Sequence, residues 1–151
     1  MSLKQQIDTD LKAAMLAGDK PLVMTLRGLK STILYAEVAF GVRDKGLSDD
    51  ETLEVLSKEA KKRQESIDLY NQVGKKEQAD TEAKEKKFIE KYLPTPLSET
   101  EIAAQIDAVI SDMGDVNASQ MGQIIGAVKS KTTGRADGAV IARLTKERLK
   151  V

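Results

Sequence analysis

The chain has 151 residues, with 24 basic and 24 acidic side chains and neither cysteine nor histidine. The balanced charge gives no overall electrostatic attraction to nucleic acid or membrane, so any RNA binding has to be local. Without thiols or imidazoles, the composition excludes disulfides, Cys–His and Ser–His catalytic pairs, and the commonest transition-metal ligands. No apolar run approaches the roughly 20 residues that span a bilayer, which predicts a cytoplasmic protein.

Apolar residues recur at helical spacing along the whole chain and strand signals are weak, which predicts an all-α fold of about seven helices. Three start signals fit capping boxes, in which a serine hydroxyl and a side chain three residues later satisfy the first free amides. These boxes begin at Ser2, Ser48 and Ser98 and predict helices that start near residues 3, 49 and 99. Asp19 is expected to cap a second helix with Pro21 in its first turn.

The second helix carries apolar residues on two sides, which predicts that it lies at the centre of the first lobe. One side holds Leu22, Leu26, Leu29, Ile33 and Phe40, and the other holds Met24, Gly28, Tyr35 and Ala39. The basic residues Arg27 and Lys30 lie on this same helix. We expect them to have a structural role, with the arginine tying helices together through Glu59 or Glu82.

On the third helix, Lys61, Lys62 and Arg63 are expected to form a paired, solvated face. Further along, Pro94-Thr95-Pro96 cannot continue a helix, because proline lacks an amide hydrogen and restricts the residue before it. We therefore predict two lobes, a four-helix bundle-like lobe at 1–94 and a three-helix lobe at 95–151. The second lobe is small enough to need docking on the first lobe or on a partner.

Charge in the second lobe is divided along the sequence. Residues 97–117 hold five acidic and no basic side chains, whereas residues 118–151 hold seven basic and two acidic ones. Within the basic half, Arg143, Lys146 and Lys150 share one side of the last predicted helix and form a basic ridge. The ridge lies beside an apolar stripe made of Val140, Ile141, Leu144 and Val151. Asp137 is expected to cap this helix, and Asn117 or Ser119 the one before it.

The helix between those caps has an apolar stripe of Met121, Ile124, Ile125 and Val128. Gly122, Gly126 and Lys129 line the flank of that stripe. Each interior glycine costs roughly 1 kcal/mol of helix stability relative to alanine, so a close backbone contact is expected in return. The flank is either a seam for packing another helix or a groove that faces a ligand.

Five segments spread along essentially the whole chain form a recognisable set. They are Leu26-Arg27, Lys30-Ser31, Lys62-Arg63-Gln64-Glu65-Ser66, Tyr92-Leu93-Pro94 and the stretch from Met121 to Gly138. Together they resemble the YqeY-like proteins of bacteria. The same helical module is similar to the C-terminal appendage of GatB, a subunit of the glutamine-dependent amidotransferase that acts on misacylated Glu-tRNA or Asp-tRNA. In that enzyme the appendage holds tRNA. The amidotransferase's catalytic parts have no counterpart in these residues.

The resemblance implies a tRNA-associated accessory protein that binds and does not catalyse. An alternative is a protein-interaction adaptor that docks through the C-terminal lobe. A free-standing carbon–nitrogen ligase with glutamine as amido donor is the least favoured function. The partner would be tRNA, a tRNA-processing complex or another protein, and no membrane, cofactor or metal is expected.

The candidate contact residues for tRNA or a partner lie in the second lobe. They are Gly122, Gly126, Lys129, Lys131, Arg135, Arg143, Lys146 and Lys150. Basic side chains form charge-assisted contacts with phosphate oxygens, although solvated helical faces carry the same residues. Three or four phosphate contacts would give a salt dependence shallower than about −4. No catalytic residue is predicted, and no calcium or phosphate-binding loop is recognisable.

Overall fold

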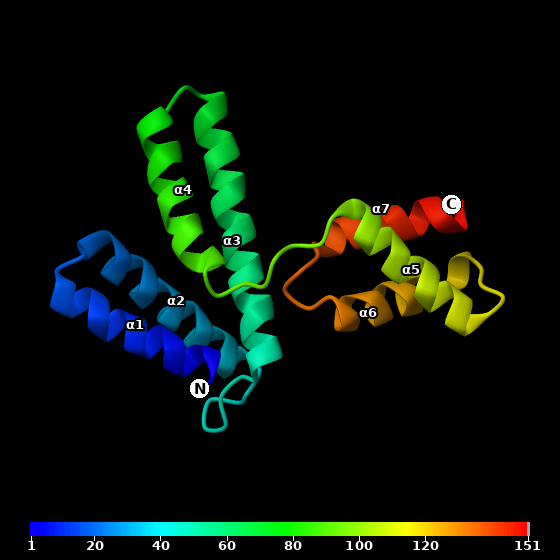
Figure 1. The fold of residues 1–151 in the computed structure, drawn as a ribbon, viewed down its shortest axis with the longest axis horizontal. Helices are drawn as coiled ribbons and strands as arrows, with labels where there is room; N and C mark the ends of the chain where they lie inside the picture. The colour runs from blue at the N-terminus through cyan, green and yellow to red at the C-terminus, as the bar shows by residue number, and fades with distance from the viewer. Residues whose placement is uncertain (151) are drawn as a thin grey trace. The chain divides into compact units, whose positions relative to one another are not determined.

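The computed structural model describes residues 1–150, and the predicted role of Val151 in the last apolar stripe lies outside them. The described residues form seven α-helices, one short 3-10 helix and no strand, which confirms the all-α prediction. The helices are α1 (Leu3–Ala17), α2 (Lys20–Ala39), α3 (Asp49–Gln72), α4 (Lys76–Glu90), α5 (Glu99–Met113), α6 (Met121–Lys131) and α7 (Gly138–Leu149). They divide into two compact units, Met1–Leu93 and Pro94–Val151 (Figure 1).

The three capping boxes form as the sequence predicts. The Ser2 hydroxyl accepts from the Gln5 amide at 3.2 Å, and the Gln5 side chain accepts from the Ser2 amide at 2.9 Å. Equivalent pairs start α3 at Ser48 and α5 at Ser98. Because each box satisfies two otherwise free amides within four residues, the start of each of these helices is fixed locally.

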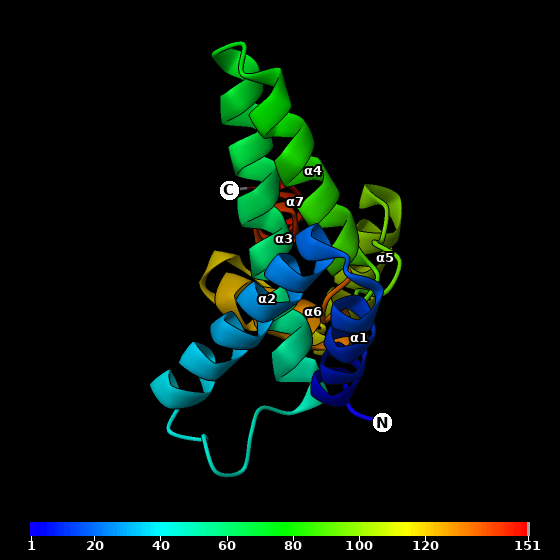
Figure 2. The same ribbon diagram turned by 90° about the vertical axis from the view of Figure 1, so that its left-hand side faces the viewer.

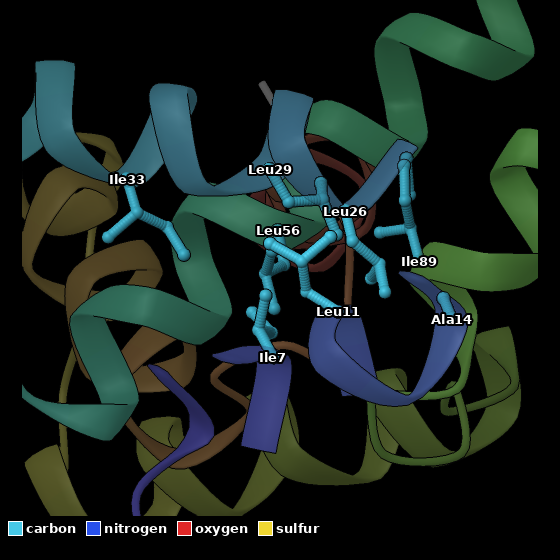
Figure 3. Packing of buried hydrophobic residues seen from close by; sticks show 9 residues of the cluster. Ile7, Leu11, Ala14, Leu26, Leu29, Ile33, Leu56 and Ile89 are labelled. Carbon is cyan, nitrogen blue, oxygen red and sulfur yellow. The ribbon is translucent and has the colours of Figure 1, made fainter. Parts of the chain in front are cut away.

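In the N-terminal unit, α1 lies beside α2, and α3 and α4 form a long hairpin (Figure 2). One side of α2 supplies Leu26, Leu29 and Ile33, which are almost completely buried. Figure 3 shows them pointing from α2 into the space occupied by Ile7 and Leu56. The predicted core side of α2 is therefore buried, except for its last member, Phe40.

The other apolar side of α2 is exposed: α2 contacts α1, α3 and α4, as expected of a central helix, but it is not covered on both sides. Met24 is 72% exposed and Tyr35 is 75% exposed, and Phe40 is 67% exposed just beyond the end of the helix. The reason is that α1, α3 and α4 contribute to one cluster on the Leu26 side. A second apolar side indicates that another element can pack there, but no element of this unit does.

A buried carboxylate joins three segments of the N-terminal unit. Glu37 of α2 is 1% exposed and accepts from Lys4 Nζ of α1 at 2.5 Å. It also accepts from the backbone amide of Leu47, in the loop before α3, at 3.3 Å. The hydrogen bond from Lys4 lowers the Glu37 pKa, and the Leu47 amide adds to that effect against the opposing influence of burial. Sequence patterns gave no sign of this contact.

The C-terminal unit has its own apolar cluster, formed by one side of each of its three helices. It consists of Ile102, Ile106, Val109, Ile124, Val128, Ile141 and Leu144. Two threonines are also buried, and their hydroxyls donate to carbonyl oxygens four residues earlier, from Thr132 to Val128 and from Thr145 to Ile141. These bonds satisfy the hydroxyls without any partner from another helix.

Candidate functional site

The glycine flank of α6 faces open space. Ile124 and Val128 are buried on the opposite side, as the apolar stripe predicts, whereas Gly122 and Gly126 are exposed. A Cβ atom added at either glycine would meet no described atom within 4 Å outside the helix's own backbone. Within the described chain the flank is therefore not a packing seam, because no other helix uses the missing side chains, and of the two alternatives an open surface is what the structure shows.

Alanine substitutions provide a direct check of that open flank. Gly122→Ala and Gly126→Ala are each expected to stabilise the C-terminal unit by about 0.5–1 kcal/mol, because alanine is the better helix former and nothing obstructs its methyl group. Urea unfolding should show a higher midpoint with an unchanged slope. A lower midpoint would mean that the glycines are needed for packing after all.

The glycine that is closely approached is Gly138, the first residue of α7. A Cβ there would lie 2.8 Å from Lys129 Cε and 3.1 Å from Lys129 Nζ. Lys129 of α6 therefore extends across the start of α7. Asp137 caps that helix as predicted, with its carboxylate accepting from the Ala139 amide at 3.0 Å. Lys129 is thus an exposed residue whose side chain reaches from α6 to the start of α7.

Arg135, between α6 and α7, makes a structural contact. Its Nε donates to the Thr95 carbonyl at 3.0 Å, while its own carbonyl accepts from the Leu97 amide at 2.8 Å. These two bonds fix the segment that leads into α5. The side chain is therefore already engaged, which makes Arg135 a weaker candidate for phosphate contact than the sequence suggested.

The basic ridge of α7 is partly neutralised by acidic side chains. Arg143 pairs with Glu99 of α5 and, at 3.4 Å, with Glu147 on its own helix. Lys146 and Lys150 of the ridge are exposed and have no ion pair recorded among the described residues. The ridge therefore has two available lysines and one arginine that shares its charge with carboxylates.

A second α5–α7 contact was not predicted: Arg148 Nε donates to Asp107 at 2.7 Å. Together with the Arg143–Glu99 pair, it joins the acidic half of the unit to the basic half. The division of charge along the sequence was the signal that could have revealed this pairing. Of the predicted contact residues, Lys129, Lys131, Lys146 and Lys150 are exposed and take part in neither of these ion pairs.

The N-terminal unit corrects one charge prediction. Arg27 is exposed with no ion pair recorded among the described residues, and Lys30 pairs with Asp8 at 2.5 Å. The arginine that joins helices is Arg63 of α3, which pairs with Glu82 at 3.1 Å and also with Glu85 of α4. The expected acidic partner was right but the arginine was wrong, because Arg63 faces the long α3–α4 contact.

Residues 1–150 show no metal cluster and no membrane span. No group of three or more acidic residues there is arranged to hold a metal ion. No helix among the described residues is long and apolar enough to cross a membrane. The candidate site is the surface that the sequence selected in the C-terminal unit, an open glycine flank with exposed lysines on α6 and α7.

Comparison with known proteins identifies the family. A family model described as Yqey-like protein matches residues 4–149. The chain belongs to the YqeY-like family. The resemblance found in the sequence is thereby confirmed, since the match extends over nearly the whole length of this YqeY-like protein.

Two relatives of this YqeY-like protein are called Altered inheritance of mitochondria protein 41, mitochondrial. The one from Kluyveromyces lactis is 32% identical over 127 residues, which span 82% of this chain and 67% of the relative. The one from Eremothecium gossypii is 36% identical over 107 residues, which span 69% of this chain and 57% of the relative. Neither relative is bacterial, so the bacterial origin expected from the resemblance has no support from them.

Proposed function

We propose that this YqeY-like protein is a non-catalytic tRNA-associated accessory protein whose C-terminal unit provides the RNA-facing surface. The observation that carries the proposal is the open flank of α6, where Gly122 and Gly126 expose helix backbone beside Lys129. A flank without side chains lets a bulky sugar-phosphate strand come close to the helix. The lysine on the same side of the helix supplies a positive charge that can contact a phosphate oxygen.

The distribution of charge supports lysines as the main contacts. Arg143 and Arg148 are engaged with carboxylates, and Arg135 donates to the backbone. Lys131, Lys146 and Lys150 are exposed, and each can turn toward a phosphate without breaking an ion pair to another described residue. Lysine acts on phosphate as a mobile point charge and gives little base specificity. We therefore propose recognition of the tRNA backbone and shape over recognition of its sequence.

A binding role requires only charge and shape, and the C-terminal unit offers both. Catalysis by this chain alone would need a general base or nucleophile, and with no histidine or cysteine these would have to come from carboxylates, hydroxyls or lysines. We keep the expected cytoplasmic location as part of the proposal, although the names of the two relatives place those proteins in mitochondria.

The test is a titration with bulk tRNA at several salt concentrations. Wild type should bind with a logarithmic salt slope of about −3, the value for four phosphate contacts at roughly 0.7–0.9 each. The variant in which Lys129, Lys131, Lys146 and Lys150 are all changed to glutamate should lose this binding. Electrophoretic mobility shift or fluorescence anisotropy would measure both quantities.

A matched control separates a local surface from net charge. Changing Lys12, Lys58, Lys75 and Lys84 to glutamate alters the total charge equally but lies in the N-terminal unit, where all four lysines are exposed. That variant should retain most of the affinity. Equal loss in both variants, or wild-type binding that does not respond to salt, would refute the proposed surface.

The adaptor function remains the second candidate, because an open glycine flank also admits a helix from another protein. It predicts that a pull-down captures a protein partner. The capture should require Gly122 and Gly126 and should persist after nuclease treatment. The RNA proposal predicts that nuclease abolishes the capture.

A further inference from the structure

The exposed side of α2 has the residue spacing of a helix-docking seam. Met24, Gly28, Ser31, Tyr35 and Val38 are separated by four, three, four and three residues, and all five are exposed. That alternation is the heptad spacing by which one helix packs along another. Three of the five are large apolar or aromatic residues with more than half of their surface exposed. The seam is therefore an apolar stripe about four turns long on the outside of the N-terminal unit.

Gly28 adds an independent observation at the middle of the seam. A Cβ there would meet no described atom within 4 Å outside the helix's own backbone, so the fold itself does not need a glycine at this position. An interior glycine nevertheless weakens a helix. Gly28 and Ser31 are the two small residues between Met24 and Tyr35, and we call this position the notch, because small side chains let a second helix approach closely.

The charges around the seam specify the kind of helix that fits. The basic residues of α2 are Lys20, Arg27 and Lys30, of which Lys30 is paired with Asp8. The structure describes every residue of α2, and its only acidic residue is Glu37, which is buried and paired with Lys4. Lys20 and Arg27 therefore leave the border of the seam positive. Charges at such flanking positions set partner choice in helix pairs.

We propose that this seam binds an amphipathic helix of a partner protein, with a narrow apolar stripe flanked by glutamate or aspartate. The apolar residues of the partner pack on Met24, Tyr35 and Val38, its backbone comes closest at Gly28, and its carboxylates meet Arg27 and Lys20. A second copy of the same seam fits less well, because both surfaces would bring positive borders with no exposed carboxylate on α2 to offset them.

The probe is a labelled helical peptide about three heptads long, with alanine and leucine at the seam positions and glutamate at the flanking positions. A matched peptide carries lysine at the same flanks. Fluorescence anisotropy with the full-length protein at low salt should show binding of the acidic peptide. The affinity for the basic peptide should be at least about tenfold lower. The preference should shrink as salt is added.

Two variants test the seam without endangering the fold. Gly28→Leu fills the notch, and because its space is open and leucine favours helix, the protein should remain folded with unchanged or higher thermal stability. Its affinity for the acidic peptide should fall at least about tenfold. Arg27→Glu should reverse the preference toward the basic peptide, whereas Lys12→Glu on α1 should not.

Three results would overturn the proposal: equal binding of the two peptides, binding of neither, and affinity for the acidic peptide that is unaffected by Gly28→Leu. Sedimentation of the protein alone tests whether a second copy of the chain occupies the seam instead. Concentration-dependent dimers that disappear in Gly28→Leu would assign the seam to a second copy and would also refute the partner helix.

Discussion

Replacing Ile124 with alanine is expected to unfold the C-terminal unit while the N-terminal unit stays folded. Ile124 is fully buried in a cluster drawn only from α5, α6 and α7. Removing its side chain should cost about 2–5 kcal/mol, from lost burial and the cavity left behind. A unit of under about 60 residues has little stability in reserve. In hydrogen exchange, the backbone amides of α5–α7 should therefore lose their protection, while those of α1–α4 should keep it.

Leu26→Ala provides the reciprocal experiment. Leu26 is fully buried in the other cluster, so this change should remove protection from α1–α4 and spare α5–α7. If either substitution lowered protection equally in both units, the two clusters would unfold as one cooperative body. The division at Leu93 would then describe the geometry of the chain without describing its energetics.

Glu37→Ala is expected to be the most damaging substitution of a charged residue. It removes the acceptor for both Lys4 Nζ and the Leu47 amide, and with it the link between α1, α2 and the loop before α3. Lys4 is exposed enough to regain water, so the main losses are the hydrogen bonds and the buried amide. Destabilisation of about 2–3 kcal/mol is expected in chemical denaturation.

The same contact predicts a pH dependence. Because the folded protein holds the Glu37 pKa below its usual value, the contact contributes fully to stability above that usual value. Its contribution is lost as the pH falls through the lowered pKa and the carboxylate becomes protonated. The denaturation midpoint should therefore decline in acid more steeply in wild type than in Glu37→Gln, which cannot titrate. Parallel declines would show that Glu37 does not carry this effect.

Helix starts with a capping side chain were predictable, because their causes lie within a few residues. The start of α6 was not: Asn117 caps the 3-10 helix Ala118–Gln120, and Gln120, the cap of α6, makes no side-chain hydrogen bond. Ser2, Ser48 and Ser98 each have their box partner three positions later, and α1, α3 and α5 begin where those signals place them. The buried stripes followed for a similar reason, since a helix with one apolar side has to cover it. Local signals of this kind also predicted Asp137 as the cap of α7.

What failed to follow from the sequence depends on neighbours that only the fold supplies. The flank at Gly122 and the second apolar side of α2 both indicate that something can approach, but not whether this chain provides it. Likewise, Arg27 and Arg63 are both arginines within helices, and the sequence does not distinguish them. Only the position of α4 decides which arginine forms ion pairs. The candidate site was thus predicted as a region, while its available charges had to be read from the structure.

The Arg143–Glu99 pair has a consequence for any anion that reaches α7. Glu99 sits at the start of α5 and occupies the guanidinium that a phosphate would otherwise contact, so it acts as a built-in competitor. A phosphate gains Arg143 only by displacing a carboxylate that belongs to the same molecule. Because both side chains are exposed to solvent, the pair is weak and a phosphate can displace Glu99 at little cost. Under the proposed function, a strand that also contacts the neighbouring lysines would compete for Arg143 better than a free phosphate would.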